Sequence, residues 1–474
     1  MIDKLFGLVR KYDVYILLSA YFAAGLLTII FFDGTGDDGD SVMHYFFAKY
    51  APVHPELYFD HWAKPLFVMI SSPFAQFGFA GMKLFNLCVS SFTFYLTFQT
   101  ARLLGIRNPL LVIVFLVFTP LYYVLTFSGL TEPLFALFLI GAIFLVLRNG
   151  RIAASLVVSF MPFVRSEGLI FIGVFGLYFM LSRQWKYLPW LLTGHLVLSL
   201  AGFFVYHDLL WVFNRIPYAS LEPKYGSGPL LHFVFQLNYV LGVPLYFLMI
   251  AGVISYPVNY FRKAEVIRKE EYYLVVTGAF AFILTHSLFW YFGIFSSMGL
   301  KRVLLCIVPL ASLISLRGFN MLLYTFPLNS KIRVAAGGVV VLYISIFPFM
   351  HNPASIHWDT EMQLTASQSI SKGVAHYLKD KPVAPNGKYY YAAPYLGEAL
   401  HLDPFSNKLR ADLNSSNLMT IKTGDVVIWD NWFAVVESGI TLESLTLIPG
   451  LTREIDFNSP GNGEKVSYVL FRKE

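Results

Sequence analysis

Four aspartates lie within eight residues near the N-terminus, directly after a long apolar run. They are Asp33, Asp37, Asp38 and Asp40, in the segment FFDGTGDDGD. Glycine-rich acidic segments of this kind often form solvated turns. Asp40 differs because it precedes the aromatic segment SVMHYFFAKY, where a carboxylate can lie at the start of a helix. At a boundary between water and an apolar phase, such a carboxylate could take a proton from a hydroxyl group.

The same aspartates have a second possible use. Asp38 and Asp40 offer carboxylate oxygens, which are the ligands that hard divalent cations prefer. The chain has two cysteines, Cys88 and Cys306, and both fall inside apolar runs, so neither a disulfide framework nor a Cys/His zinc pattern is indicated. A divalent cation at Asp38 and Asp40 therefore stays open as a possible cofactor.

Basic residues stand beside apolar runs in two other segments. Arg165 lies in FVRSEGL with Glu167, and Lys301 and Arg302 lie in GLKRVLLCIVPL. Such cations can extend to an interface through their aliphatic stems. An ionisable residue at membrane depth is also a functional candidate, and Arg can bind a phosphate through two hydrogen bonds. These cations therefore predict a site for a phosphate or pyrophosphate.

Four further ionisable residues complete the set of candidates for substrate binding. His44 follows the aspartates, and His61 and Lys64 lie in YFDHWAKPLF. A lone histidine is more often structural than catalytic. Glu132, in SGLTEPLFALF, could equally be an acid in the first turn of a helix. We expect these residues, together with Glu167, to surround a substrate.

The elements that must position these residues are membrane-spanning helices. The 474-residue chain is 56% hydrophobic and 14% charged, whereas a soluble domain is about 25% charged. A span needs about 20 apolar residues. Eleven runs qualify, of which the fifth and sixth are short and indicate broken helices or a hairpin: 12–32, 82–104, 109–127, 131–147, 152–164, 168–182, 187–207, 233–256, 272–292, 303–323 and 333–350.

The charges of the connectors predict the orientation of these spans. If the N-terminus is cytoplasmic, each connector on that side carries Lys or Arg, as the positive-inside rule requires. The aspartates, Glu132, Glu167 and the last residues of the chain then lie on the opposite side. Residues 351–474 hold 11 Lys and Arg against 14 Asp and Glu, so residues 1–350 hold 24 against 15 and carry a net charge of +9. This distribution favours anionic lipid, and not nucleic acid, as the partner.

Two domains are expected. Residues 1–350 form the transmembrane domain, whose first outer loop, 33–81, contains two segments with the pattern of interfacial helices. Residues 351–474 combine the strand-like runs KYYYAA, GDVVIWD and KVSYVLFRK with the helical run QSISKGVAHYLKD. The predicted fold class is therefore a mainly α-helical polytopic membrane protein with a small C-terminal α/β domain.

This combination resembles the C-class (GT-C) membrane glycosyltransferases, in particular their protein O-mannosyltransferase and aminoarabinose-transferase branch. In that family an acidic first loop precedes a YF-(D/E)-K-P-P-L segment. TEPLFALFLIGAIFLVLRNGR, VRSEGLIF and KRVLLCIVPLASLISL resemble later spans of the family. One departure is that the family's adjacent Asp-Glu is replaced by DDGD. The residues that match the first-loop segment are Tyr58, Phe59, Asp60, Lys64, Pro65 and Leu66.

The resemblance implies a sugar donor carried on a polyprenyl phosphate, an extracytoplasmic active site and inversion at the anomeric carbon. By its distance from the Lys-Pro segment, Asp40 maps to the catalytic carboxylate, with Asp38 as the second choice. Arg302, Lys301 and Arg165 map to the donor phosphate. The acceptor is a hydroxyl of a glycan, lipid or protein, and we expect a prokaryotic plasma membrane as the location.

Two alternatives use the same cations without this reaction. A transporter or flippase for a lipid-linked saccharide would be expected to carry an internal repeat or ionisable residues at the midplane, which the sequence lacks. A ligase that uses a pyrophosphate-linked glycan would be expected to carry a long late outer loop, but the loop at 293–302 is short.

Overall fold

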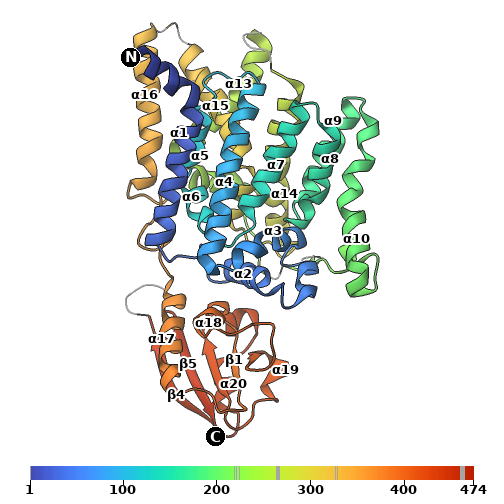
Figure 1. Cartoon of the computed structure of the whole chain (residues 1–474), viewed down its shortest axis with the longest axis vertical. Coiled ribbons are helices and arrows are strands. Elements are labelled where there is room, and N and C mark those ends of the chain that lie inside the picture. Colours follow the sequence, from blue (N-terminus) through green and yellow to red (C-terminus); the bar gives the residue numbers. More distant parts are fainter. Residues whose placement is uncertain are drawn as a thin grey trace.

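The chain consists of a bundle of helices and a small domain, built around a sheet, at one end of the bundle (Figure 1). The computed structural model describes residues 2–217, 219, 221–223, 225–262, 267–325, 327, 329–459 and 465–474. The mainly helical fold class with a small C-terminal α/β domain, predicted from the sequence, is confirmed. We call residues 351–474 the tail domain.

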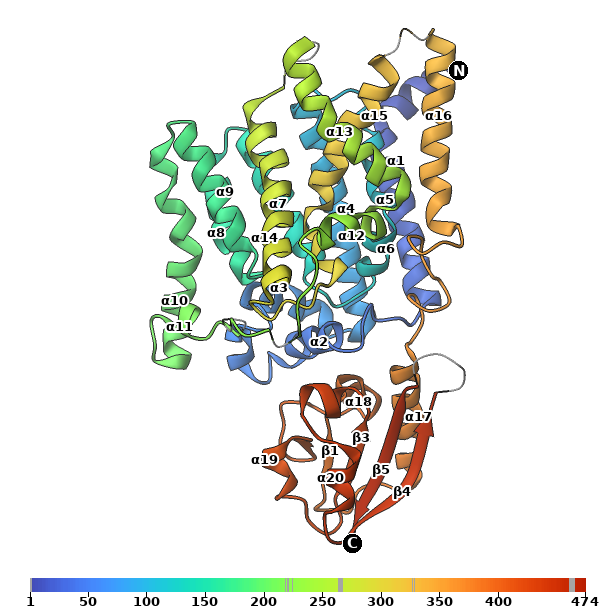
Figure 2. The same cartoon turned by 180° about the vertical axis from the view of Figure 1, so that it is seen from behind.

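Seven helical segments among the described residues are long and apolar enough to cross a membrane, and each matches a predicted span. In Figure 2, α12, α13 and α14 lie on the face toward the viewer. The elements of these seven segments are α1 (Ile2–Phe31), α4 (Gly78–Leu103), η3 (Trp185–Tyr187) with η4 (Pro189–Leu192) and α10 (Thr193–Tyr206), α13 (Val243–Arg262), η5 (Glu271–Val276) with α14 (Thr277–Phe292), η6 (Lys301–Ile307) with α15 (Val308–Thr325), and α16 (Ser330–Ile346) with η7 (Phe347–Phe349).

Three of the remaining predicted spans are shorter apolar helices. They are α7 (Glu132–Leu147), α8 (Arg151–Phe160) with η2 (Met161–Phe163), and α9 (Gly168–Leu181). The expectation that 152–164 and 168–182 would be short is met by the bounds of α8 and α9. These two helices also pack against each other as neighbours.

Two predicted spans are not continuous helices. The run 109–127 divides into α5 (Leu111–Val117) and α6 (Pro120–Thr126), because Pro120 has no N–H to continue the helix. The run 233–256 is interrupted at Gly242, whose φ of 77° ends α12 (His232–Leu241) before α13 begins. Apolar length indicated these runs but could not place the breaks.

The first loop forms two helices that lie across the end of the bundle next to the tail domain (Figure 1). They are α2 (Asp40–Tyr50) and α3 (Pro65–Ala75), joined through η1 (Pro55–Phe59). Both were predicted as interfacial helices. Their inner faces are buried, and α2 and α3 pack against each other.

The tail domain contains a five-stranded sheet in the order β2-β1-β3-β5-β4. β1 (Tyr389–Tyr391) pairs in parallel with β2 (Arg410–Asp412) and β3 (Val426–Asp430), and β5 (Ser467–Lys473) pairs antiparallel with β3 and β4 (Leu451–Asn458). The three predicted strands and the predicted helix, α17 (Ala366–Asp380), are present. The shorter elements are α11 (Trp211–Asn214) in the bundle and α18 (Pro394–Ala399), α19 (Ser415–Leu418), η8 (Phe433–Glu437) and α20 (Leu442–Thr446) in the tail domain.

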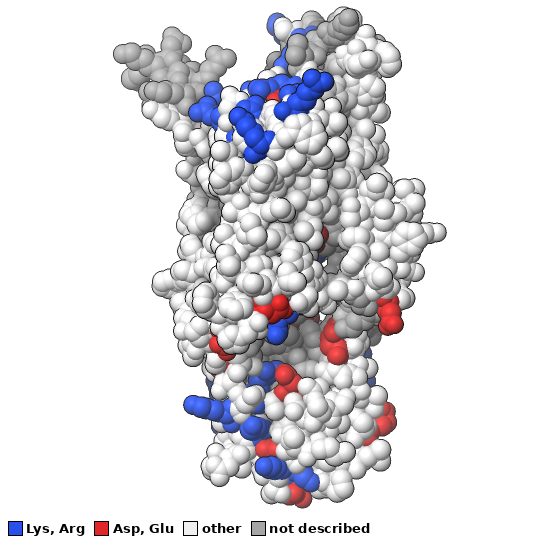
Figure 3. Space-filling model, turned by 90° about the vertical axis from the view of Figure 1, so that its right-hand side faces the viewer, with Lys and Arg blue, Asp and Glu red and all other residues white. Residues whose placement is uncertain are grey.

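Charged side chains are concentrated at the two ends of the bundle. Lys and Arg gather at the end opposite the tail domain, and a band almost without charge separates them from the acids and bases near the tail domain (Figure 3). This arrangement is that of an integral membrane protein. Which end faces the cytoplasm stays a prediction.

The centre of the bundle is α15. It packs closely on α13 because two glycines remove side chains at the contact: a Cβ on Gly318 would lie 2.0 Å from the Leu248 carbonyl oxygen, and one on Gly252 would lie 2.0 Å from that of Ile314. Small residues allow such close backbone approach in membranes. The position of α15 in turn fixes η6, which carries Arg302.

A buried ion pair holds the opposite end of α15. The Arg317 Nε and Nη2 atoms each donate to a carboxylate oxygen of Glu271 at 2.8 Å, and the Tyr256 hydroxyl donates to Glu271 Oε1 at 3.0 Å. Arg317 and Glu271 are 3% and 1% exposed. These bonds connect α13, η5 and α15 at one point.

We expect Arg317→Met to destabilise the protein by about 3–5 kcal/mol, because it leaves the Glu271 carboxylate buried without its partner. The double variant Glu271→Gln/Arg317→Met is expected to recover a large part of that loss. Thermal unfolding of the purified proteins in one detergent measures both. A double variant less stable than the sum of the two single variants would contradict the role of the pair.

Candidate functional site

A cluster of ionised side chains lies at the end of the bundle next to the tail domain. At its centre the Arg302 guanidinium donates from Nη1 to Asp37 Oδ2 and from Nη2 to Asp40 Oδ2. Its Nε lies 3.7 Å from Glu132 Oε1. Arg302 therefore joins the first loop to α7. Asp40 and Arg302, which the sequence analysis assigns to the same side, are in contact in this cluster, and the side of the membrane on which they lie stays a prediction.

Arg165 extends the cluster through two acids. Its Nη1 lies 2.9 Å from Glu132 Oε1, and its Nη2 donates to Glu167 Oε1 at 2.8 Å. Nη1 also donates to Thr131 Oγ1 at 2.9 Å. The Glu132 side chain is fully buried, so it depends on Arg165 and Arg302 for compensation of its charge.

The Glu167 carboxyl has a lowered pKa. Burial acts to raise the pKa of its carboxyl, but the Arg165 guanidinium outweighs burial and the pKa falls to about 2. His286 Nε2 lies 3.8 Å from Glu167 Oε1. The sequence analysis missed His286, although an ionisable residue within the apolar run 272–292 is itself a signal.

The backbone of the first loop holds Asp37 in place. Asp37 Oδ1 accepts hydrogen bonds from the N–H groups of Gly39 at 3.1 Å and Ser41 at 2.8 Å. Gly36 has a φ of 86°, which favours glycine. Burial raises the pKa of the Asp37 carboxyl to about 6, although Arg302 acts in the opposite direction.

Asp40 is the more accessible of the two carboxylates that bind Arg302. Its side chain is 45% exposed, against 24% for Asp37. It occupies the first turn of α2, where the helix dipole favours a negative charge. Asp40 can therefore reach both Arg302 and a molecule that enters from the aqueous side.

Asp38 lies apart from this cluster. Its carboxylate accepts a hydrogen bond from the Thr365 hydroxyl of the tail domain, and burial raises its pKa. Asp38 and Asp40 thus have different partners. Within the described ranges, no group of three or more His, Cys, Asp or Glu side chains is arranged to hold a metal ion. A cation at Asp38 and Asp40 stays an untested prediction.

The remaining predicted site residues lie around the cluster at different distances. Lys64 is buried and donates to Ser166 Oγ at 2.9 Å, beside Arg165 and Glu167, and burial lowers its pKa to about 8. The His44 ring stacks on Trp62, with centroids 4.8 Å apart, and burial lowers its pKa to about 3, so it is neutral.

Two predicted residues contact other groups. His61 Nε2 lies 3.0 Å from the Val212 carbonyl oxygen, on the side of α11. The Lys301 ammonium lies 5.8 Å from the centroid of the Tyr239 ring, on α12. The structure therefore brings five of the predicted residues into one network of ion pairs: Arg302, Arg165, Asp40, Glu132 and Glu167. Asp37, which the sequence analysis had not selected, belongs to the same network through Arg302.

The tail domain contacts the first loop directly. Gln368, in the first turn of α17, donates from Nε2 to Thr35 Oγ1 at 2.5 Å and to the Asp37 carbonyl oxygen at 3.2 Å. The Gly34 N–H donates to the Met362 carbonyl oxygen at 2.9 Å. No local sequence pattern could have identified Gln368, because this contact joins segments more than 300 residues apart.

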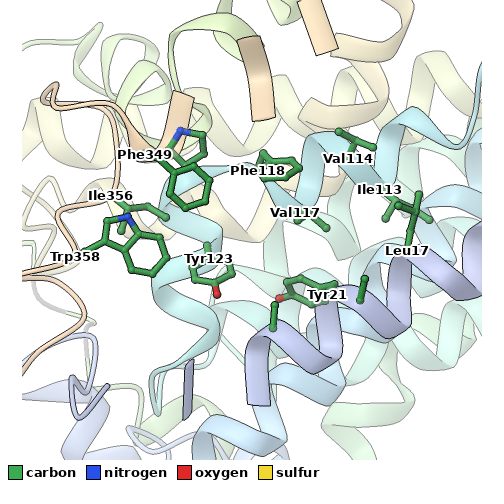
Figure 4. A pocket seen from close by; sticks show the side chains of 13 residues that line it. Leu17, Tyr21, Ile113, Val114, Val117, Phe118, Tyr123, Phe349, Ile356 and Trp358 are labelled. Atoms are coloured by element: carbon green, nitrogen blue, oxygen red, sulfur yellow. The ribbon is translucent and has the colours of Figure 1, made fainter. Parts of the chain in front are cut away.

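A separate apolar cavity of about 340 Å³ lies between α1, α5, α6 and the linker to the tail domain (Figure 4). Its lining includes Tyr21, whose hydroxyl lies 3.3 Å from Thr126 Oγ1, and Tyr123, whose hydroxyl lies 2.7 Å from Thr28 Oγ1. The other lining side chains are apolar or Trp358. This cavity offers no charged group for a phosphate, so we place the candidate site at the ionised cluster.

The fold of the chain is similar to solved structures of ArnT from Cupriavidus metallidurans. The structure of ArnT bound to undecaprenyl phosphate has a TM-score of 0.60 and 12% identity, with 96% of this chain and 97% of that chain covered. The apo structure has a TM-score of 0.61 and 10% identity, with 97% and 98% covered. No family model and no curated protein matches the chain. The similarity confirms that the chain has a GT-C-like fold.

Proposed function

We propose that this protein is a membrane glycosyltransferase that moves a sugar from a polyprenyl-phosphate donor to an acceptor hydroxyl. The single observation that carries this proposal is the Arg302 guanidinium bound between Asp37 and Asp40 at one end of a membrane bundle. It supplies a phosphate-binding cation and a proton acceptor at adjacent positions. The GT-C-like fold, shared with an ArnT that binds undecaprenyl phosphate, supports the same donor class.

The donor phosphate would compete with the carboxylates for Arg302. Nη2 of the guanidinium can donate to a phosphate oxygen. Asp37 is held by two backbone N–H groups, whereas Asp40 is the more exposed partner. We therefore propose that phosphate binding displaces Asp40 from Nη2. Release from the guanidinium leaves the Asp40 carboxylate able to accept a hydrogen bond from the acceptor hydroxyl.

The transfer step then follows in one displacement. The acceptor oxygen attacks the anomeric carbon while its proton passes to Asp40. The bond between the anomeric carbon and the phosphate oxygen breaks, and the polyprenyl phosphate leaves with the electron pair and one additional negative charge. Arg302 stabilises that charge, and attack opposite the leaving group inverts the configuration. A preorganised donor of this kind contributes roughly 3–4 kcal/mol.

Arg165 is better suited to positioning than to direct phosphate binding. To reach a phosphate it would have to leave both Glu132 and Glu167, of which Glu132 is fully buried. We propose that Arg165 fixes Glu132, which lies 3.7 Å from Arg302 Nε and orients the guanidinium. Lys64 and neutral His44 would border the acceptor, and Lys301 would meet the donor from the side of α12.

We expect Asp40→Asn to lower turnover by about 10²- to 10⁴-fold with donor binding retained, because the proton acceptor is removed. Asp38→Asn is the matched control, since it makes the same change two residues away but outside the cluster, and it is expected to keep turnover within a few-fold. The measurement is transfer of radiolabelled sugar from a panel of polyprenyl-phosphate sugars by purified protein in detergent.

Full transfer by Asp40→Asn would contradict the assignment of Asp40. A donor that binds wild-type protein in detergent without any covalent transfer, where no gradient exists, would favour the transporter or flippase alternative. Transfer only from pyrophosphate-linked glycans would favour the ligase.

Stability and donor binding are both expected to rise as the pH falls from 7 to 5. The pKa of Asp37 is raised to about 6 from an unfolded value near 3.8, so the folded state binds this proton more tightly. Lowering the pH therefore stabilises wild type relative to Asp37→Asn. It also removes the negative charge of a carboxylate that competes with the donor phosphate for Arg302, so donor binding by wild type rises. The pH profiles of melting temperature and donor binding for both proteins test this, and parallel profiles would contradict it.

We expect Gln368→Ala to reduce kcat by about five- to tenfold, the equivalent of one lost hydrogen bond in the reacting geometry. Gln368 acts through the backbone of the first loop, so it is a positioning residue. Asp403→Ala is the control, because it removes a different contact of the tail domain, the 2.7 Å hydrogen bond between Asp403 Oδ2 and His54 Nε2. An equal loss of kcat in both variants would indicate general undocking of the tail domain. Gln368→Glu is expected to recover only part of the kcat that Gln368→Ala loses.

A further inference from the structure

A second charged hollow lies at the end of the bundle opposite the tail domain. It has a volume of about 410 Å³ and is formed by the start of α8, the segment that follows α9, and η3. It is far from the ionised cluster, because α8 and α9 both extend along the bundle between the two (Figure 1). Its lining residues are Arg151, Arg183, Gln184, Trp185, Lys186 and Tyr187.

The lining carries three cations and no acid. Three polar atoms at or beside the hollow are buried without a hydrogen-bond partner: Arg151 Nε, Gln184 Oε1 and Ser182 Oγ. Buried polar atoms are nearly always satisfied by protein, water or a ligand. The hollow therefore offers hydrogen-bond donors and positive charge to an anion, and an acceptor to a hydroxyl group.

The backbone at Arg183 gives independent support. α9 ends at Leu181, and Arg183 follows in the left-handed region with a φ of 55°. Glycine is the usual residue at this position after a helix, and another residue is strained there. The chain nevertheless presents an arginine at this position, in the lining of the hollow.

The rim of the hollow has the character of a lipid interface. Trp185 is 58% exposed and Trp190 is 41% exposed, and the neighbouring Leu181 and Leu192 are also exposed. The Lys186 ammonium lies 5.2 Å from the centroid of the Tyr187 ring. Aromatic and basic side chains of this kind lie at the depth of lipid headgroups. The exposed leucines would contact acyl chains.

We propose that this hollow binds the phosphate of an anionic membrane lipid, with a hydroxylated headgroup such as phosphoglycerol. The guanidinium groups of Arg151 and Arg183 and the Lys186 ammonium hold the phosphate. The side-chain amide oxygen of Gln184, Oε1, accepts a hydrogen bond from a headgroup hydroxyl. The apolar rim favours a lipid over a soluble phosphate. This site does not rest on the proposed function, because it shares no residue with the ionised cluster.

The sharpest test is Arg183→Gly. Glycine fits a φ of 55° better than arginine, so thermal stability in detergent is expected to stay equal or to rise. Retention of phosphatidylglycerol is expected to fall about tenfold, because a charged contact to the phosphate is lost. Native mass spectrometry of the full chain, released from nanodiscs of mixed phosphatidylcholine and phosphatidylglycerol, measures retention.

The matched control is Asn149→Gly. Asn149 occupies the equivalent left-handed position after α7, with a φ of 63°, and does not line the hollow. Its phosphatidylglycerol retention is expected to equal that of wild type. An equal loss in both variants, or no loss in either, would overturn the proposal.

A second pair of variants separates this site from general surface charge. Arg151→Gln/Lys186→Gln removes two cations from the hollow, and Arg102→Gln/Lys331→Gln removes two cations at the same end of the bundle, on α4 and α16. Only the first pair is expected to lose the retained lipid. Displacement of the lipid by millimolar inorganic phosphate, or protection of the apo protein by that phosphate alone, would assign the hollow to a soluble ligand instead and overturn the lipid proposal.

Discussion

The sharing of one guanidinium between two carboxylates is the interaction on which the candidate site depends. An isolated charge at this depth would be strongly disfavoured, and Arg302, Asp37 and Asp40 compensate one another. Because the two acids together exceed the charge of Arg302, the arrangement can exchange one acid for a phosphate without leaving the cation alone. The ion pair therefore compensates these charges within the protein, and it would also suit the exchange of one acid for the phosphate of the proposed donor.

This exchange requires a rigid support on one side and a replaceable partner on the other. Arg302 belongs to η6, which continues into the deeply buried α15, and the glycine contacts with α13 fix the position of that helix. Asp37 is held by backbone N–H groups, and Gln368 holds the same loop from the tail domain. Asp40 lacks comparable restraints. This physical asymmetry between the two carboxylates, and not their chemistry, is the reason that we propose an anchoring role for Asp37 and a reacting role for Asp40.

Much of the fold could be predicted because apolar length and charge sidedness are properties of the sequence alone. The breaks at Pro120 and Gly242 were not placed, because apolar length alone does not say where a helix ends, although the missing N–H of Pro120 is itself a local signal. The expectation that Asp40 and Arg302 lie on the same side came from the distribution of charges among the connectors. The choice between Asp37 and Asp38 did not, since the backbone at Gly36 and the hydroxyl of Thr365 determine which carboxylate turns inward. Those contacts are tertiary, and Thr365 lies more than 300 residues away.

The two ends of the bundle differ in how their charged side chains are compensated. Near the tail domain, acids and bases are paired within the protein, so their charges are compensated internally. At the other end, the lining of the hollow around Arg183 contains three cations and no acid. We propose that an anionic lipid balances this charge without occupying the ionised cluster. On this proposal the membrane contacts the protein through lipid headgroups at one end, and the proposed reaction between a lipid-borne donor and a water-borne acceptor takes place at the other end.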